Sequence, residues 1–256
     1  MSVVDDKRVA GSGRRLHAPL YVYGIVRPGA PAPARPGVLG GEVATVGHGA
    51  GAALVTPLES ERVRAKRRDL LAHSDVVQDA HALGTVLPLR FGTIFESEAD
   101  LRDRLLASRH DELVSLLERF DGLGELRVRA SYHDQDTVLA EIVKATPEIA
   151  RLRARARSGA ELVQLGELVA KSYAARRDAD ADAVVRRLAT VALEAHVDPP
   201  DDDLTVVKAS FLVRDRVPFD EQLDAVALGL RHLVDFACTG PMPPHSFVAL
   251  RGDGDA

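Results

Sequence analysis

The chain has no tryptophan, one cysteine and only 4% aromatic residues among its 256 positions. A single cysteine excludes an intramolecular disulfide, and a lone thiol such as Cys238 is typical of proteins in a reducing cytosol. No run of about 18 apolar residues is present, so the sequence predicts no membrane-spanning helix. Residues 1–19 have no apolar core of the kind that marks a secretory signal, and we expect them to form a disordered leader. These features predict a cytoplasmic protein.

The chain also has little excess of charge of one sign, because its net charge is only -5 and no long block carries a single sign. Bulk charge therefore does not predict nucleic-acid binding, and we expect neither a nucleic-acid nor a membrane partner. The apolar content of 46% is enough for a buried core, and the length suits two domains. We place their boundary after the glycine-rich turn 121–124. The expected domains cover 20–123 and 124–250, followed by an acidic tail over 251–256.

The first half combines short β-prone runs with apolar residues at helical spacing. Pro88 would place its strand at an edge or break it, because proline has no backbone N–H to donate. Ser97 is an expected helix N-cap. Together these patterns predict an N-terminal α/β domain with a small mixed sheet. The expected strands cover 20–26, 42–46, 52–56 and 85–95, and the expected helices cover 59–82 and 101–117.

The second half opens with a strand in which Leu126, Val128, Ala130 and Tyr132 alternate with polar residues, the pattern of a half-buried strand. The order strand, helices, strand, helix, strand predicts an α+β domain, and a ferredoxin-like arrangement with extra helices in the first crossover fits it. The proline-rich run 241–244 is expected to lie extended over a surface. The expected strands are 125–132, 204–214 and 232–237, and the expected helices are 137–145, 160–175, 179–195 and 219–230.

Several residues invite a chemical interpretation that their spacing does not support. His73 and His81 are eight residues apart, about 12 Å along a helix, so they cannot share one metal ion. Asp75 and Asp79 are one turn apart and could share one, but exposed carboxylates are usually solvated. The glycine-rich run 47–51 lacks the Lys-Ser/Thr of a phosphate-binding loop and fits a hairpin connection instead. We therefore assign no metal, cofactor or catalytic residue.

Two sets of arginines remain open to more than one interpretation. Four arginines alternate from Arg151 to Arg157, where they could contact an acidic partner or RNA, or be solvated on a helix; no aromatic residues lie between them to stack bases. Arg90 lies between two apolar residues, so it needs a partner or a solvated head group. It could form an ion pair with Glu96 or Glu98, or contact another protein.

Three separated segments form a recognisable set. They are Tyr21-Val-Tyr-Gly-Ile-Val26, then Val86-Leu-Pro-Leu-Arg-Phe-Gly-Thr-Ile-Phe95, and finally Ala209-Ser-Phe-Leu-Val213 with Phe219 and Thr239-Gly-Pro-Met-Pro-Pro-His-Ser-Phe-Val248. Together they resemble the GvpL/GvpF family of gas vesicle proteins, in the family's order and at its approximate spacing from residue 20 to residue 250. Met242 and His245 depart from the family pattern, which usually has Trp and Tyr there.

This resemblance implies a two-domain α+β protein with a ferredoxin-like C-terminal domain. It implies an accessory or minor structural role in gas vesicle formation, located at the vesicle. The implied partners are the small hydrophobic shell protein and other vesicle accessory proteins, and no enzyme activity is implied. A ferredoxin-like regulatory module that binds a small ligand is the alternative. The residues predicted to contact a partner are Arg90, Phe91, Pro241, Met242, Pro243, Pro244 and Phe247.

Overall fold

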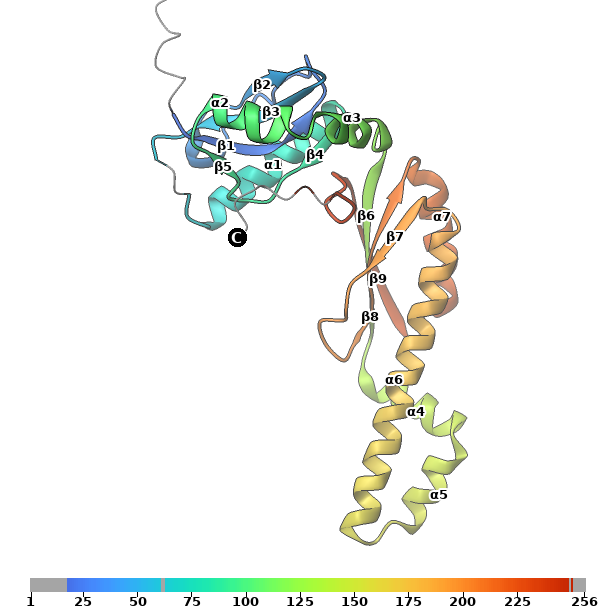
Figure 1. Ribbon diagram of the computed structural model, residues 1–256. Helices are drawn as coiled ribbons and strands as arrows, with labels where there is room; N and C mark the ends of the chain where they lie inside the picture. The colour runs from blue at the N-terminus through green and yellow to red at the C-terminus, as the bar shows by residue number, and fades with distance from the viewer. Residues whose placement is uncertain (1–17, 61–62, 249, 251–256) are drawn as a thin grey trace, which may run out of the picture. The chain divides into compact units, whose positions relative to one another are not determined.

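The computed structural model describes residues 18–60, 63–248 and 250. The chain divides into two compact units, each with its own sheet (Figure 1). Unit 1 consists of Met1–Leu123 and Met242–Ala256, and unit 2 consists of Gly124–Pro241. Except for its last two residues, the expected leader over 1–19 lies outside the described residues, and so does the expected tail over 251–256. The domain limits given above stay a prediction.

The sheet of unit 1 has the strand order β2-β3-β1-β4, and β5 also pairs with β1. All of its described pairings are antiparallel, so the predicted mixed sheet is wrong. The chain returns through α1 from β3 to β4, so these two strands run in the same direction, but β1 lies between them. The strands are β1 (Leu20–Val26), β2 (Ala44–His48), β3 (Gly51–Pro57), β4 (Val86–Pro88) and β5 (Ile94–Phe95), and the helix is α1 (Arg67–Leu83).

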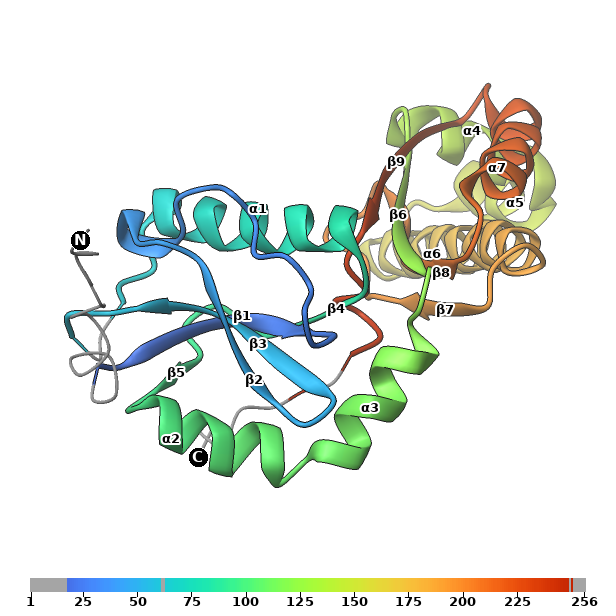
Figure 2. The ribbon, with the colours of Figure 1, turned by 90° about the horizontal axis from the view of Figure 1, so that it is seen from above.

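Helices cover both faces of this sheet. Helix α1 lies on one face, and α2 (Glu98–Leu101), the π-helical turn η2 (Arg102–Ala107) and α3 (His110–Arg119) lie on the other (Figure 2). All seven residues of β1 are therefore buried, as in a strand that is covered on both sides. The predicted N-cap is confirmed, because the hydroxyl of Ser97 accepts a hydrogen bond from the backbone of Asp100 at 3.1 Å.

Two predictions for unit 1 are corrected. Helix α1 begins at Arg67 and not near residue 59, because Lys66 has an extended backbone and Val63 packs against the core from a non-helical segment. The expected strand over 85–95 is split into β4 and β5, because Phe91 and Gly92 form a turn in which Gly92 has a φ of 92°. Glycine adopts this left-handed conformation without steric cost.

Unit 2 contains a four-stranded sheet in the order β7-β8-β6-β9, with its helices packed on one face (Figure 1). The predicted alternation of β6 is confirmed: its apolar side chains enter the core, while Arg127 and Arg129 are exposed. The strands are β6 (Gly124–Tyr132), β7 (Glu194–Val197), β8 (Thr205–Val213) and β9 (Val234–Met242). The helices are α4 (Gln135–Ala145), α5 (Pro147–Arg155), α6 (Gly159–Ala189) and α7 (Arg216–Leu230).

The helices of unit 2 differ from the prediction in two places. A single 31-residue helix, α6, replaces the two expected over 160–175 and 179–195. A capping box at Ser158 begins it, and an ion pair between Arg176 and Asp180 supports it where the break was expected. The expected helix also included Glu194 and Ala195, which instead begin β7, because pairing with β8 outweighs their helix propensity.

The end of the chain also differs from the prediction. Strand β9 continues to Met242, beyond the expected 232–237. A turn follows the expected run 241–244, because the carbonyl of buried Pro244 accepts hydrogen bonds from the backbones of Phe247 and Val248, both at 3.1 Å. Within the described part of the chain, no helix is both long enough and apolar enough to cross a membrane.

Candidate functional site

An aromatic cluster lies beneath α1 in unit 1. Tyr21 and Tyr23 come from β1, His73 from α1, and Phe91 from the turn after β4. The ring centroids of Tyr21 and Tyr23 are 4.9 Å apart, and the imidazole of His73 stacks on Tyr23 at 5.6 Å. Phe91 contacts both Tyr21 and His73 at 5.8 Å between centroids. Three of the six Tyr and Phe residues of this unit therefore meet in one cluster.

Burial and hydrogen bonds fix the charge and the tautomer of His73. One ring nitrogen donates to the backbone carbonyl of Leu89. In the neutral ring Nδ1 therefore accepts from the hydroxyl of Tyr21 at 2.9 Å, and that hydroxyl accepts from the backbone of Gly92 at 3.1 Å. Burial, and to a smaller extent the nearby charge of His245, lowers the pKa of His73 to about 4. The imidazole is thus neutral near pH 7, and burial raises the pKa of Tyr21 well above its usual range.

A second set of hydrogen bonds connects Tyr23 to the proline-rich loop. Its hydroxyl accepts from the backbone of Val38 at 2.8 Å and bonds to Oγ1 of Thr56 at 2.8 Å. Because Thr56 donates to the carbonyl of Glu42 at 3.1 Å, the Tyr23 hydroxyl must donate to Thr56. Gly37 fits closely here, since a Cβ at this position would collide with the Tyr23 hydroxyl. This network holds the 37–42 segment against β1 and β3.

We expect Tyr23→Phe to lower the free energy of unfolding by about 2 kcal/mol. The substitution leaves the buried backbone N–H of Val38 without a partner and leaves the Thr56 hydroxyl only its bond to Glu42. Urea denaturation of the purified protein measures this change. The control is Tyr173→Phe, which removes a hydroxyl that donates to the carbonyl of Asp203, where water can replace it, at a cost of about 0.5 kcal/mol. Equal costs for the two substitutions would contradict this account of the Tyr23 network.

The structure separates the predicted partner-contact residues into different environments. The Arg90 side chain is exposed, whereas Phe91 is half-buried in the aromatic cluster. Pro243 and Pro244 are buried, and His245, next to them in the chain, is close enough for its charge to affect His73. The 90–91 and 243–247 segments therefore approach the same cluster. Their role in partner binding stays a prediction. The other three predicted residues are exposed Pro241 and the half-buried Met242 and Phe247.

The two carboxylates considered for a metal have another partner. Arg35, from the proline-rich loop, forms ion pairs with both Asp75 and Asp79, at 2.9 and 2.8 Å. The one-turn spacing of these carboxylates thus serves to hold the loop on α1. Across the residues that the structure describes, no group of three or more potential ligands could hold a metal ion.

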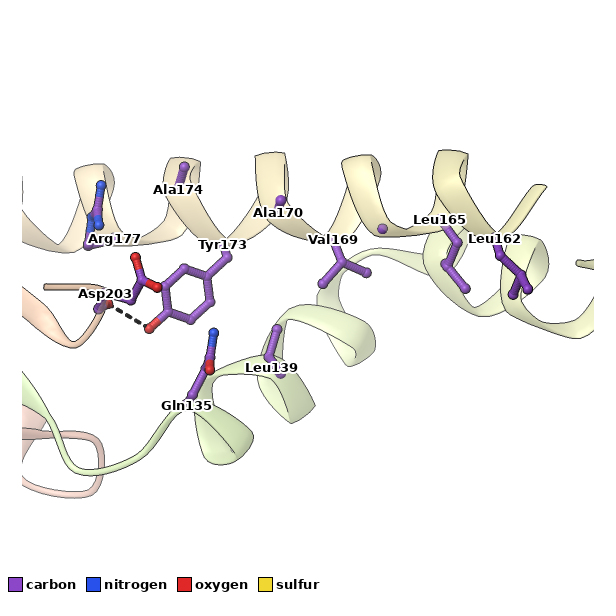
Figure 3. A pocket seen from close by; sticks show the side chains of 11 residues that line it. Gln135, Leu139, Leu162, Leu165, Val169, Ala170, Tyr173, Ala174, Arg177 and Asp203 are labelled. Carbon is purple, nitrogen blue, oxygen red and sulfur yellow. Dashed lines mark hydrogen bonds between the residues drawn. The ribbon is translucent and has the colours of Figure 1, made fainter. Parts of the chain in front are cut away.

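Unit 2 contains an apolar groove of about 520 Å³ along α6, which we call the α6 groove. Leu162, Leu165, Val169 and Tyr173 project from successive turns of α6 to the same side, and Leu139 of α4 lies opposite Tyr173 and Val169 (Figure 3). At its far end, the hydroxyl of Tyr173 donates to the carbonyl of Asp203 at 2.9 Å. Sequence reasoning predicted the helix but not that this face stays partly open, although the 162, 165, 169, 173 spacing was a visible signal.

The α6 groove has a basic end. Helix α5 exposes the side chains of Arg151, Arg153 and Arg155, and Arg157 follows in the connection to α6. The backbone N–H of Arg157 donates to Glu161 at 2.9 Å, one residue before Leu162. In the described part of the chain, none of these four arginines forms an ion pair with an acidic side chain within 4 Å. An apolar surface and a basic surface therefore meet at the start of α6.

Comparison with known proteins places this arrangement in a family. The chain matches the family described as "Gas vesicle synthesis protein GvpL/GvpF" over residues 19–249. It is 36% identical over 239 residues to gas vesicle protein F of Streptomyces sp. (strain CB03234), which covers 89% of this chain and 98% of that protein. It is 31% identical over 262 residues to gas vesicle protein L of the same organism, covering 90% and 92% of the two chains.

Solved structures agree with the fold. The crystal structure of GvpF from Anabaena sp. PCC7120 superimposes with a TM-score of 0.78 at 21% identity, covering 92% of this chain and 98% of that one. GvpF from Microcystis aeruginosa gives a TM-score of 0.75 at 21% identity, with 91% and 100% covered. Given the match across nearly its whole length, the chain belongs to the GvpL/GvpF family of proteins involved in gas vesicle formation.

Proposed function

We propose that this protein is an accessory or minor structural protein of the gas vesicle that binds the hydrophobic shell protein and supports vesicle assembly. The observation that carries the proposal is the family match over residues 19–249, which leaves almost none of the chain unaccounted for. A shell subunit with exposed apolar surface aggregates in water before it is incorporated. A protein that covers this surface and then releases it needs no catalysis, so we propose no enzyme activity.

Two surfaces of unit 2 support a binding role. Strand β7 is at the edge of its sheet and all four of its residues are exposed, so an extended partner segment could add to it. The α6 groove offers apolar side chains from two helices. We also infer that unit 2 is ferredoxin-like: its strands take the order 2-3-1-4 across the sheet, with helical crossovers after the first and third.

The direct test is capture of the shell protein. Immobilised protein is expected to retain freshly diluted shell protein at micromolar concentration, and a heat-unfolded sample of the same chain is the control. We expect both proteins to occur at gas vesicles in the cytoplasm, together with other vesicle accessory proteins. Failure of the folded protein to retain any shell protein would contradict the proposal.

One observation favours a second function. The volume of the α6 groove, about 520 Å³, lies within the range of small-molecule sites. A regulatory module that binds a small ligand there would be stabilised by that ligand. A thermal-shift screen separates the two functions: a metabolite that raises the melting temperature by several degrees favours the module, and an unchanged melting temperature favours shell-protein binding.

A further inference from the structure

The α6 groove has the dimensions of one helix. Its lining residues extend along α6 from Leu162 to Arg177, about 22 Å at 1.5 Å per residue. Gly166, Ala170 and Ala174 recur every fourth residue among them. Because these side chains are small, another helix could approach the backbone of α6 closely along this stripe. Helices that pack face to face lie 8–10 Å apart when such small side chains separate them.

The walls of the α6 groove select a helix over a strand. Both walls are helices whose backbone groups are bonded within the helix, so the groove presents no free ladder edge to an extended segment. Leu162 remains 56% exposed and its neighbour Val163 remains 61% exposed at the open end. An apolar partner surface along α6 would remove a large apolar area of these two side chains from water.

The charge around the α6 groove selects an acidic occupant. The chain as a whole is acidic, with a net charge of -5. The segment that leads into α6 next to Leu162 nevertheless carries four exposed arginines at 151, 153, 155 and 157. At the opposite end, Arg177 has a side chain that is 21% exposed, and its ion pair with Asp178 is long, at 3.8 Å. The lining at this end also includes the exposed Asp203. The carboxylates of a partner would therefore meet guanidinium groups mainly at the arginine-rich end near Leu162.

We propose that the α6 groove and the arginines of 151–157 form one docking site for an amphipathic partner helix of about four turns, with an apolar face and acidic flanks. This inference rests on the proposed function, because it names the surface through which the protein holds its vesicle partner. Single-stranded RNA is a poorer occupant, since no aromatic side chain lies among the arginines to stack bases.

A matched pair of variants tests the apolar part of the site. Ala170→Glu puts a carboxylate in the α6 groove, whereas Ala179→Glu makes the same change on an exposed residue of α6 that does not line it. The probe is a fluorescent synthetic helix of about 16 residues with a Leu/Ala face and Glu flanks. Ala170→Glu is expected to weaken its binding about tenfold or more, and Ala179→Glu to leave it unchanged. Equal affinities for both variants would overturn the site.

A second pair tests the charge. Arg153→Gln with Arg155→Gln is expected to weaken the probe about threefold at low salt, and Arg186→Gln with Arg187→Gln at the other end of α6 to have no effect. A probe with Lys in place of Glu should bind at least about tenfold more weakly. Equal binding of both probes, or displacement of the Glu probe by a polyuridine 20-mer, would overturn the acidic helix as occupant.

Shell-protein capture separates this inference from the proposed function. If the wild-type protein and Ala179→Glu retain the shell protein and Ala170→Glu does not, the docking site is supported. If Ala170→Glu retains it as well as the wild type, the α6 groove is overturned as the docking site while the proposed function stands. If the wild type retains no shell protein but binds the Glu probe, the proposed function fails. The α6 groove is then still supported as a docking site for an acidic amphipathic helix.

Discussion

Replacing Gly240 with alanine is expected to lower the free energy of unfolding of unit 2 by about 4 kcal/mol, from backbone strain and steric overlap combined. Gly240 lies in β9 with a φ of 125°, a conformation that residues with a Cβ rarely adopt. A Cβ there would also lie 2.5 Å from the carbonyl oxygen of Glu125 and 3.0 Å from Cδ2 of Leu126. The carbonyl oxygen of Glu125 belongs to the backbone of β6, a central strand of the sheet. It could move away from the Cβ only if the sheet were distorted.

The control for this prediction is Gly229→Ala in helix α7. No atom lies within 4 Å of a Cβ built at Gly229, and alanine favours a helix over glycine by about 1 kcal/mol. The control should therefore be neutral or slightly stabilising. Urea denaturation followed by circular dichroism measures both variants, and a Gly240→Ala protein as stable as the wild type would contradict the described path of β9.

The second large effect is a loss of stability in mild acid. The pKa of His73 is about 4 in the folded protein, against 6.5 for an unperturbed histidine. Between these values the unfolded chain binds a proton that the folded protein does not, so the free energy of unfolding decreases as the pH falls from about 6.5 to about 4. At about 1.4 kcal/mol per pKa unit, the contribution of His73 is about 3 kcal/mol.

The physical cause of this acid sensitivity is the aromatic cluster. A protonated His73 would carry a hydrogen on Nδ1, which faces the hydroxyl of Tyr21. That hydroxyl donates to Nδ1 and accepts from Gly92, so it would have to turn its own hydrogen away before it could accept from Nδ1 as well. His73→Gln is expected to flatten the pH dependence by about 3 kcal/mol across this window, whatever its own stability. His48→Asn changes an exposed histidine of the first hairpin and serves as the control. An unaltered pH slope in His73→Gln would contradict the buried neutral imidazole.

Sequence patterns predicted those parts of the fold that local physics determines. The alternation from Leu126 to Tyr132 predicted β6, and the Ser97 cap was predicted because it requires only three neighbouring residues. Strand β7 was not predicted, since Glu194–Val197 becomes a strand only through pairing with β8, which follows it in the chain. The single helix α6 was missed for a similar reason: the break placed near residue 177 had no glycine or proline to produce it.

The candidate sites were less predictable because they depend on what covers each surface. The spacing of Leu162, Leu165 and Val169 predicts an apolar helix face but not that the face stays partly open. His73 drew attention as a possible metal ligand, whereas its partners Tyr21 and Phe91 come from segments distant in the chain. Two tyrosines two residues apart in a buried strand of an aromatic-poor chain were the available signal for a polar partner beneath it.

The claim on which this account depends is that the folded protein covers the apolar surface of a shell subunit without chemistry. Light scattering of shell protein diluted from denaturant measures this most directly. An equimolar amount of this protein is expected to suppress the rise in scattering, with no nucleotide or other cofactor added, and Ala170→Glu is expected to suppress it less than Ala179→Glu. Scattering that rises as fast with this protein as with an equal mass of an unrelated soluble protein would contradict the account.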